Sequence, residues 1–190
     1  MSGSQRTVLI QKGEGIADKI VTGFLCTIPE MKEKLEGGNI MINLGTLKEI
    51  TDLRSIWPHE ALNFSPWVAE NVELLADAVG LDITVDETGS SVGDFNVDIY
   101  ASEKGTDRKI IIENQLEDTD HDHLGKLITY ASGKDADVVI WVVKHAREEH
   151  KAAVEWLNDH TDDKIGFFLC EIKLFQIGDS DIAPSFTVVE

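Results

Sequence analysis

The stretch IIIENQL, residues 110–116, places three polar side chains inside a run that otherwise predicts a buried strand. Glu113, Asn114 and Gln115 supply a carboxylate and two amides. Carboxylate and carbonyl oxygens are ligands that Mg²⁺ accepts in proteins, and an amide can also hold a water molecule in place. The run therefore predicts a chemical site built into a core strand.

A hairpin is predicted to bring a second carboxylate to this strand. DFNVDIYA, residues 94–101, alternates polar and apolar residues, which puts Asp94 and Asp98 on one face of a strand. The connection to the next strand is predicted as a two-residue turn at Gly105–Thr106, with glycine first as a type II′ turn requires. This register sets Asp98 opposite Glu113.

Two carboxylates directly opposite each other across a ladder have Cβ atoms about 5 Å apart, and they repel unless a cation lies between them. A divalent metal is the simplest such cation, and Mg²⁺ commonly takes one or two carboxylates together with water and substrate oxygens. Asp94 lies about 13 Å from Asp98 along an extended strand, so we expect it to be secondary to the Asp98–Glu113 pair.

A third carboxylate lies on the helix predicted before these strands. Ser65 as N-cap, Pro66 at the first helical position and Gly80 at the end predict a helix over 66–79. Its expected buried stripe consists of Trp67, Leu74, Leu75 and Ala78. Glu70 borders this stripe, so it either points toward the paired carboxylates or keeps its head group in water.

The remaining pattern defines the elements that must position these groups. The predicted strands are 42–50, 81–88, 94–101, 108–116, 137–143 and 165–178, and the predicted helices after 66–79 are 120–133, with Thr119 as N-cap, and 147–161. Residues 51–64 are expected to form a loop held by Trp57. The order α-β-β-β-α-β, followed by a helix and a strand, predicts an α/β fold with a mixed central sheet flanked by helices.

Composition limits the class of protein. The chain of 190 residues has a net charge of −18, and a protein that grips a phosphate backbone must present local positive charge against such a field. No apolar run reaches the roughly 18 residues that cross a bilayer, and the N-terminus lacks signal-peptide features, so we expect a cytoplasmic protein with no membrane contact. Cys26 and Cys170 have no zinc-site spacing.

Residues 1–43 hold one strand candidate and one helix candidate that ends at Gly37–Gly38. We interpret them as an N-terminal appendage of unknown role, and residues 44–190 as the main domain.

A helix glutamate, an aspartate in the second strand and a Glu-x-Lys-like step in the third resemble the PD-(D/E)xK nuclease superfamily, which has the restriction-endonuclease-like fold. IWPHEALNFSPWVAEN, VGDFNVDI, IENQL and TDHDHLGKLITYASG resemble more closely an uncharacterised microbial branch, with an E-N-Q variant of the third-strand motif. The resemblance covers the chain from about Leu44 to Glu190.

Carried over residue by residue, the resemblance makes Asp98 and Glu113 metal ligands, with the carbonyl of Asn114 as a third, and Mg²⁺ or Mn²⁺ as the cofactor. Gln115 stands where the family usually has a catalytic lysine. A neutral amide can position water but supplies no charge to the phosphate, so Gln115 is expected to orient the nucleophile. Glu70 is expected to assist through water or a second ion.

The following helix could return the missing charge. Lys126 and Tyr130 lie four residues apart on one face, where some branches of the superfamily carry Gln-x-x-x-Tyr. Lys126 is either a charge stabiliser or a surface lysine, and Tyr130 is expected to contact substrate. His121 and His123 point to different sides and should not share a metal; His123 either contacts substrate phosphate or packs in the first turn.

These features lead to the hypothesis of a metal-dependent nuclease that hydrolyses phosphodiester bonds, with DNA as the expected substrate, in defence or repair. The alternative is a nuclease-fold module that binds nucleic acid or a protein partner with weak or no catalysis, which the missing lysine and the net acidity favour. Nucleases of this fold often pair to cut both strands, so the resemblance leaves a homodimer open.

Overall fold

The computed structural model describes residues 44–92 and 95–190. Contacts divide the chain into two units, Met1–Leu44 and Gly45–Glu190. The predicted N-terminal appendage, residues 1–43, and the candidate ligand Asp94 lie outside the described residues.

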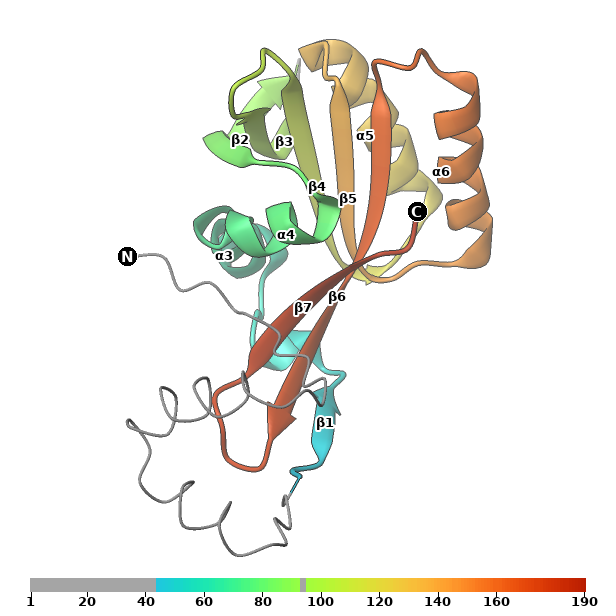
Figure 1. Cartoon of the computed structure of the whole chain (residues 1–190). Coiled ribbons are helices and arrows are strands. Elements are labelled where there is room, and N and C mark those ends of the chain that lie inside the picture. Colours follow the sequence, from blue (N-terminus) through green and yellow to red (C-terminus); the bar gives the residue numbers. More distant parts are fainter. Residues whose placement is uncertain (1–43, 93–94) are drawn as a thin grey trace, which may run out of the picture. The chain divides into compact units, whose positions relative to one another are not determined.

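One mixed sheet organises the unit Gly45–Glu190 (Figure 1). Its seven strands follow the order β1-β6-β5-β4-β3-β2, and β7 pairs with β6. Neighbours among β4, β5 and β6 run parallel, and all other neighbours run antiparallel. The strands are β1 Leu47–Ile50, β2 Ile83–Val92, β3 Phe95–Glu103, β4 Lys109–Asp118, β5 Val138–His145, β6 Gly166–Ile177 and β7 Ala183–Val188.

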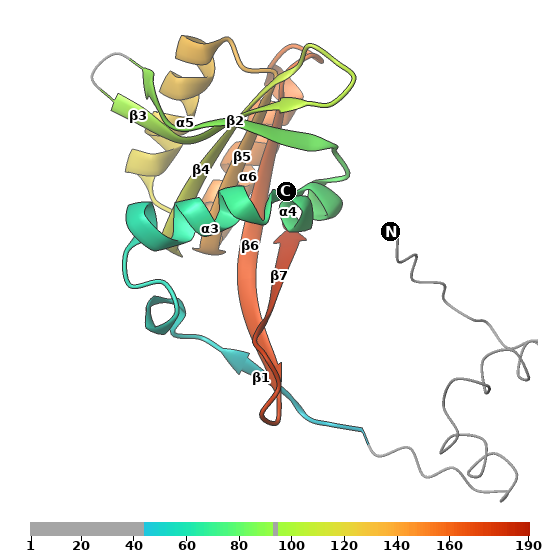
Figure 2. The ribbon, with the colours of Figure 1, turned by 90° about the vertical axis from the view of Figure 1, so that its left-hand side faces the viewer.

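Helices cover both faces of the sheet (Figures 1 and 2). They are a 3₁₀ turn Leu53–Ser55, a π-helical turn Glu60–Phe64, α3 Ser65–Glu70, α4 Val72–Val79, α5 His121–Lys134 and α6 Glu148–His160. The predicted α-β-β-β-α-β order and the mixed sheet flanked by helices are therefore confirmed. No helix within the described ranges has the length and apolarity needed to cross a membrane.

Strand β4 lies at the centre of the core, and its apolar residues serve both faces as predicted. Ile110 and Ile112 pack into the hydrophobic cluster that includes Val68 and Leu75 from α3 and α4. Ile111 packs into the second cluster, which includes residues of α5 and α6. Burial of all three isoleucines fixes which side chains of β4 point toward which helical layer.

The predicted helix 66–79 is wrong in two respects. Helical structure already begins in the π-helical turn before Ser65, so Ser65 is not an N-cap, and the predicted loop 51–64 is partly helical. The helix also breaks at Asn71, whose Nδ2 donates to the carbonyl of Trp67 at 2.8 Å. Packing explains the early start, because Trp57 meets the rings of Phe64 and Trp67 at centroid distances of 4.8 and 4.7 Å.

The stripe predicted for this helix is only partly buried. Leu75 is fully buried, whereas Leu74 is 37% exposed. The break at Asn71 interrupts the 3.6-residue period on which the predicted stripe depends.

The predicted turn type between β3 and β4 is also wrong, but the predicted register is confirmed. Thr106 donates to Glu103 at 3.3 Å, and Glu103 donates to Arg108 at 3.1 Å, which closes a four-residue loop. Gly105 has a φ of 78° at the third turn position, where a type II turn requires glycine. The longer loop has the same centre as the predicted one, so Ile99 still pairs with Ile112.

Two glycines allow a matched test of this backbone description. Gly80 ends α4 in the left-handed conformation with a φ of 73°, and Gly125 lies inside α5 with open space where an added Cβ would lie. We expect Gly80→Ala to lower the free energy of unfolding by about 1 kcal/mol and Gly125→Ala to raise it by about 0.5–1 kcal/mol. Chemical denaturation measures both, and a stabilising Gly80→Ala change would contradict the assigned helix end.

Candidate active site

The regular pairing of β3 with β4 ends just before Asp98. The last paired residues are Ile99 and Ile112, and beyond them the Oδ2 atom of Asp98 accepts the backbone N–H of Asn114 at 2.9 Å. A side-chain carboxylate thus takes the place of a main-chain acceptor. Val97 packs in the α5 cluster and Ile99 in the α3–α4 cluster, so β3 is not a regular alternating strand at Asp98, contrary to the prediction.

Glu113 lies buried beside Asp98. Burial, followed by the charge of Asp98, raises the pKa of Glu113 to about 8, although the Lys126 ammonium opposes both effects. Burial also raises the pKa of Asp98, against the stabilising Asn114 N–H and together with the charge of Glu60. The two carboxylates are therefore costly to ionise together without an added cation.

Four buried polar atoms on β4 and at the start of α3 have no hydrogen-bond partner among the described residues. They are Glu113 Oε2, Asn114 Oδ1, Asn114 Nδ2 and Ser65 Oγ. Ser65 and Asp98 line one cavity of about 290 Å³ between the start of α3 and the β2–β3 hairpin. Buried polar atoms are nearly always satisfied, so the free Glu113 Oε2 indicates a place for water or a bound ion on the α5 side of the sheet. The Asn114 side chain points to the opposite side, toward α3 and α4, as Ile112 and Leu116 do.

The donor set fits a hard divalent cation of the magnesium type. Asp98 and Glu113 supply carboxylates and Asn114 a carbonyl oxygen, which leaves positions for water and substrate. In the described part of the chain no three His, Cys, Asp or Glu side chains are grouped as a complete metal cage. A partial set of this kind suits Mg²⁺ or Mn²⁺ better than a structural zinc ion.

The acidic residue near this pair on the helical side is Glu60. Its Oε2 atom accepts the backbone N–H of Leu116 at 2.6 Å, and its charge raises the pKa of both Asp98 and Glu113. Glu70 is exposed, and within the described residues no hydrogen bond or ion pair links it to either carboxylate. The sequence did not reveal Glu60, because residues 60–64 form a π-helical turn that the 3.6-residue period does not detect.

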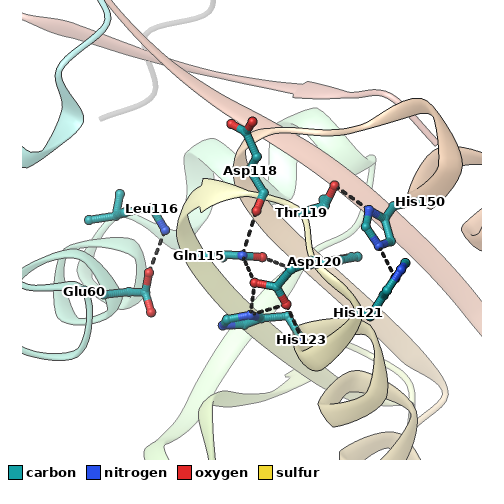
Figure 3. A network of polar contacts seen from close by, with 10 residues as sticks. Glu60, Gln115, Leu116, Asp118, Thr119, Asp120, His121, His123 and His150 are labelled. Atoms are coloured by element: carbon teal, nitrogen blue, oxygen red, sulfur yellow. Dashed lines mark hydrogen bonds and ion pairs between the residues drawn. The ribbon is translucent and has the colours of Figure 1, made fainter.

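Gln115 is held in a polar network (Figure 3). Its Nε2 atom donates to the carbonyl of Asp118 at 2.8 Å and to Asp120 Oδ2 at 2.7 Å, and its Oε1 accepts from Trp141 Nε1 at 3.2 Å. Both amide hydrogens are engaged, so Gln115 has none left to hold a water molecule. Only the second lone pair of Oε1 could still contact a water molecule, and the nucleophile-orienting role of Gln115 stays a prediction.

The N-terminus of α5 is capped by Asp120, so the predicted Thr119 cap is wrong. Asp120 Oδ1 accepts the N–H of His123 at 2.8 Å, and the two carboxylate oxygens lie 2.9 and 3.0 Å from His123 Nδ1. Thr119 is buried and instead accepts the N–H of Arg147 at 2.9 Å. Because the Thr119 hydroxyl accepts the N–H of Arg147, Asp120 caps α5 in its place.

The two histidines of α5 point to different sides, as predicted. His121 Nδ1 lies 2.9 Å from Nε2 of the buried His150, whose Nδ1 lies 2.8 Å from Thr119 Oγ1 (Figure 3). His123 points to Asp120. The His121–His150–Thr119 chain ties the beginnings of α5 and α6 together.

Lys126 and Tyr130 share the face of α5 that is turned toward Glu113. The charge of Lys126 lowers the pKa of Glu113, and Lys126 forms no ion pair with any described residue. Tyr130 is buried, and its pKa is raised by burial and by the charges of Glu113 and Asp98. The site therefore combines buried acidic oxygens with one nearby unpaired cation.

Comparisons with known proteins add one structural likeness. No protein-family model matches the chain, and no curated protein matches it. A crystal structure of a repair endonuclease from Pyrococcus abyssi is similar, with a TM-score of 0.43 and 13% sequence identity. The match covers 55% of this chain and 43% of that one, so it spans less than half of the other protein's length. The function must therefore be argued from the geometry of the site.

The Glu113→Gln variant tests the buried carboxylate. Glu113 has a pKa of about 8 in the folded chain against an ordinary 4.5, so the folded state holds this proton more tightly than the unfolded state. Its stabilising contribution is complete below the ordinary pKa and is lost as the pH rises through the folded pKa. Without metal, the melting temperature of Glu113→Gln should therefore exceed that of the parent increasingly between about pH 5 and about pH 9.

Glu155→Gln is the matched control, because Glu155 is exposed and its charge change is the same. It should shift the melting temperature little at any pH. A difference between Glu113→Gln and the parent that stays constant with pH would contradict the burial of an ionisable pair.

Proposed function

We propose that this protein is a metal-dependent nuclease that hydrolyses phosphodiester bonds of nucleic acid, with DNA as the substrate class to test first. The observation that carries the proposal is the pair Asp98 and Glu113, placed where β3 and β4 separate, with Glu113 Oε2 buried and without a hydrogen-bond partner among the described residues. Such an arrangement is unfavourable for folding alone, and a hard cation relieves it.

In this proposal Asp98, Glu113 and the carbonyl oxygen of Asn114 hold Mg²⁺ or Mn²⁺. When bound, the ion would lower the pKa of a water molecule and neutralise charge on the phosphoryl oxygens. Glu60 fixes the backbone of β4 at Leu116, and its own charge adds to the negative potential that attracts the cation. Glu70 has no role in this scheme.

Lys126 supplies a positive charge that can stabilise the reacting phosphate. Lys126 stands close enough to Glu113 to change its pKa, and its ammonium has no ion-pair partner in the described ranges. We assign it the stabilisation of negative charge that develops on the phosphate, the task that the family gives to the residue in the place of Gln115. Tyr130 and His123 lie on the same helix and are proposed to contact substrate.

A second candidate function is a nuclease-fold module that binds nucleic acid or a protein partner without efficient catalysis. Two observations favour it: Gln115 has both amide hydrogens engaged in the network, and the chain carries a net charge of −18. The first observation concerns the rate of catalysis and the second concerns the electrostatics of binding. Neither accounts for the buried Glu113 Oε2, which has no hydrogen-bond partner among the described residues.

Metal binding and cleavage measured together separate the two candidates. The nuclease should bind Mg²⁺ or Mn²⁺ by calorimetry, and Asp98→Asn should remove both the binding and the cleavage of single- or double-stranded DNA or RNA. Metal binding without any cleavage would favour the binding module. Absence of metal binding at millimolar concentration would overturn the proposed centre itself.

The Lys126→Ala variant tests the relocated charge. Its turnover should fall by about a hundredfold or more, on the order of 3 kcal/mol, as for loss of one positioned charge stabiliser. Metal affinity and melting temperature should change little. Lys164→Ala removes an exposed lysine far along the chain and is the control for net charge. Equal activity of the two variants would rule out a role for Lys126.

A further inference from the structure

The strongest unassigned feature beside the proposed site is the pair Asp120 and His123 at the start of α5. Both oxygens of Asp120 lie within hydrogen-bonding distance of His123 Nδ1, at 2.9 and 3.0 Å. A ring nitrogen that faces a carboxylate carries a proton. In the neutral ring, His123 Nε2 is then left as a proton acceptor.

A residue of β4 fixes the orientation of the Asp120–His123 pair. Gln115 Nε2 donates to Asp120 Oδ2 at 2.7 Å, so a chain of hydrogen bonds runs from β4 through Asp120 to His123 (Figure 3). Burial alone would raise the pKa of Asp120, but the hydrogen bonds from His123 and Gln115 outweigh it and lower that pKa. Asp120 stays charged and holds the ring in one orientation.

Helical spacing places His123 with the other groups of the site. His123, Lys126 and Tyr130 are separated by three and four residues, so they lie along one face of α5. The charge of Lys126 acts on Glu113 and the charge of His123 acts on Asp98, so this face is turned toward both carboxylates. The His123 side chain is 18% exposed, which leaves it accessible to water and substrate.

We propose that His123 is the proton acceptor for the attacking water of the phosphodiester hydrolysis, and that Asp120 and Gln115 are its positioning residues. This inference rests on the proposed nuclease function and gives the E-N-Q variant a specific task. Instead of touching the nucleophile, Gln115 fixes Asp120, and Asp120 fixes the ring that accepts the proton.

The step balances without a further reactant. The water oxygen forms a bond to phosphorus while His123 Nε2 takes one of its protons, and the bond from phosphorus to the leaving sugar oxygen breaks. The leaving oxygen takes a proton from solvent, and the imidazolium then releases its proton to solvent. One water molecule is consumed for each phosphodiester bond.

A purely structural interpretation of the same contacts is that Asp120 caps α5 and His123 completes the cap. The variants are chosen to separate the two. Asp120→Asn keeps a good N-cap residue but loses the charge that orients the ring. Asp122→Asn makes the same charge change in the same helical turn, and His121→Ala removes the neighbouring histidine that points elsewhere.

We expect His123→Ala to lower kcat by about a hundredfold or more, the usual range for loss of a positioned acid–base group, with unchanged Mg²⁺ binding by calorimetry. Imidazole added to the buffer should restore part of the rate of His123→Ala and none of any loss in His121→Ala. Asp120→Asn should lower kcat by about tenfold or more with little change in melting temperature, whereas Asp122→Asn should leave kcat unchanged.

Nitrogen-15 NMR of the parent provides a readout besides activity. It should show His123 as the tautomer protonated at Nδ1, and Asp120→Asn should lose this preference. Full activity of His123→Ala, or a ring protonated at Nε2, would overturn this inference alone. Absence of cleavage by the parent chain would overturn the proposed nuclease function and this inference with it.

Discussion

The candidate site depends on one hydrogen bond, from the backbone N–H of Asn114 to the carboxylate of Asp98. A regular antiparallel ladder would satisfy that N–H with a main-chain carbonyl of β3. The carboxylate takes this place and the pairing of the two strands ends, so a charged group is held inside the sheet. Glu113 is buried next to Asp98, and burial raises the pKa of both groups although the Asn114 N–H lowers that of Asp98.

Strand β4 connects this interaction to both helical layers. On one side Glu60 accepts the N–H of Leu116 and fixes the strand to the π-helical turn. On the other side Gln115 donates to Asp120, the N-cap residue of α5. The hydrogen-bonded chain of His121, His150 and Thr119 connects the start of α5 to the start of α6. The four consecutive residues 113–116 of β4 thus fix the position of the carboxylates relative to the N-terminus of α5 and its basic side chains.

The sequence predicted the features that depend on the alternation of residues along a strand and on the position of the centre of a hairpin. Apolar residues on both faces identified β4 as central. A hairpin with the right centre gave the register as far as Ile99 and Ile112, one residue before Asp98, even though its loop length was wrong. The predictions were wrong where a residue far along the chain determines which of two neighbouring residues takes a structural role. Asp120 caps α5 because Arg147 engages Thr119, and Glu60 approaches the carboxylates through a π-helical turn that Trp57 supports. Neither partner is visible in a local window.

The buried indole of Trp141 restricts which residues position 115 can accept. Trp141 is fully buried, and its N–H is accepted by Gln115. A lysine at position 115 could still donate to Asp118 and Asp120, but it offers no acceptor, so the buried indole N–H would lose its partner at a cost of about 1–3 kcal/mol. Homologues with lysine at 115 should therefore carry a residue without a donor, such as phenylalanine, at 141. The two positions form an epistatic pair, and a drift from glutamine to lysine is expected to pass through the change at 141 first.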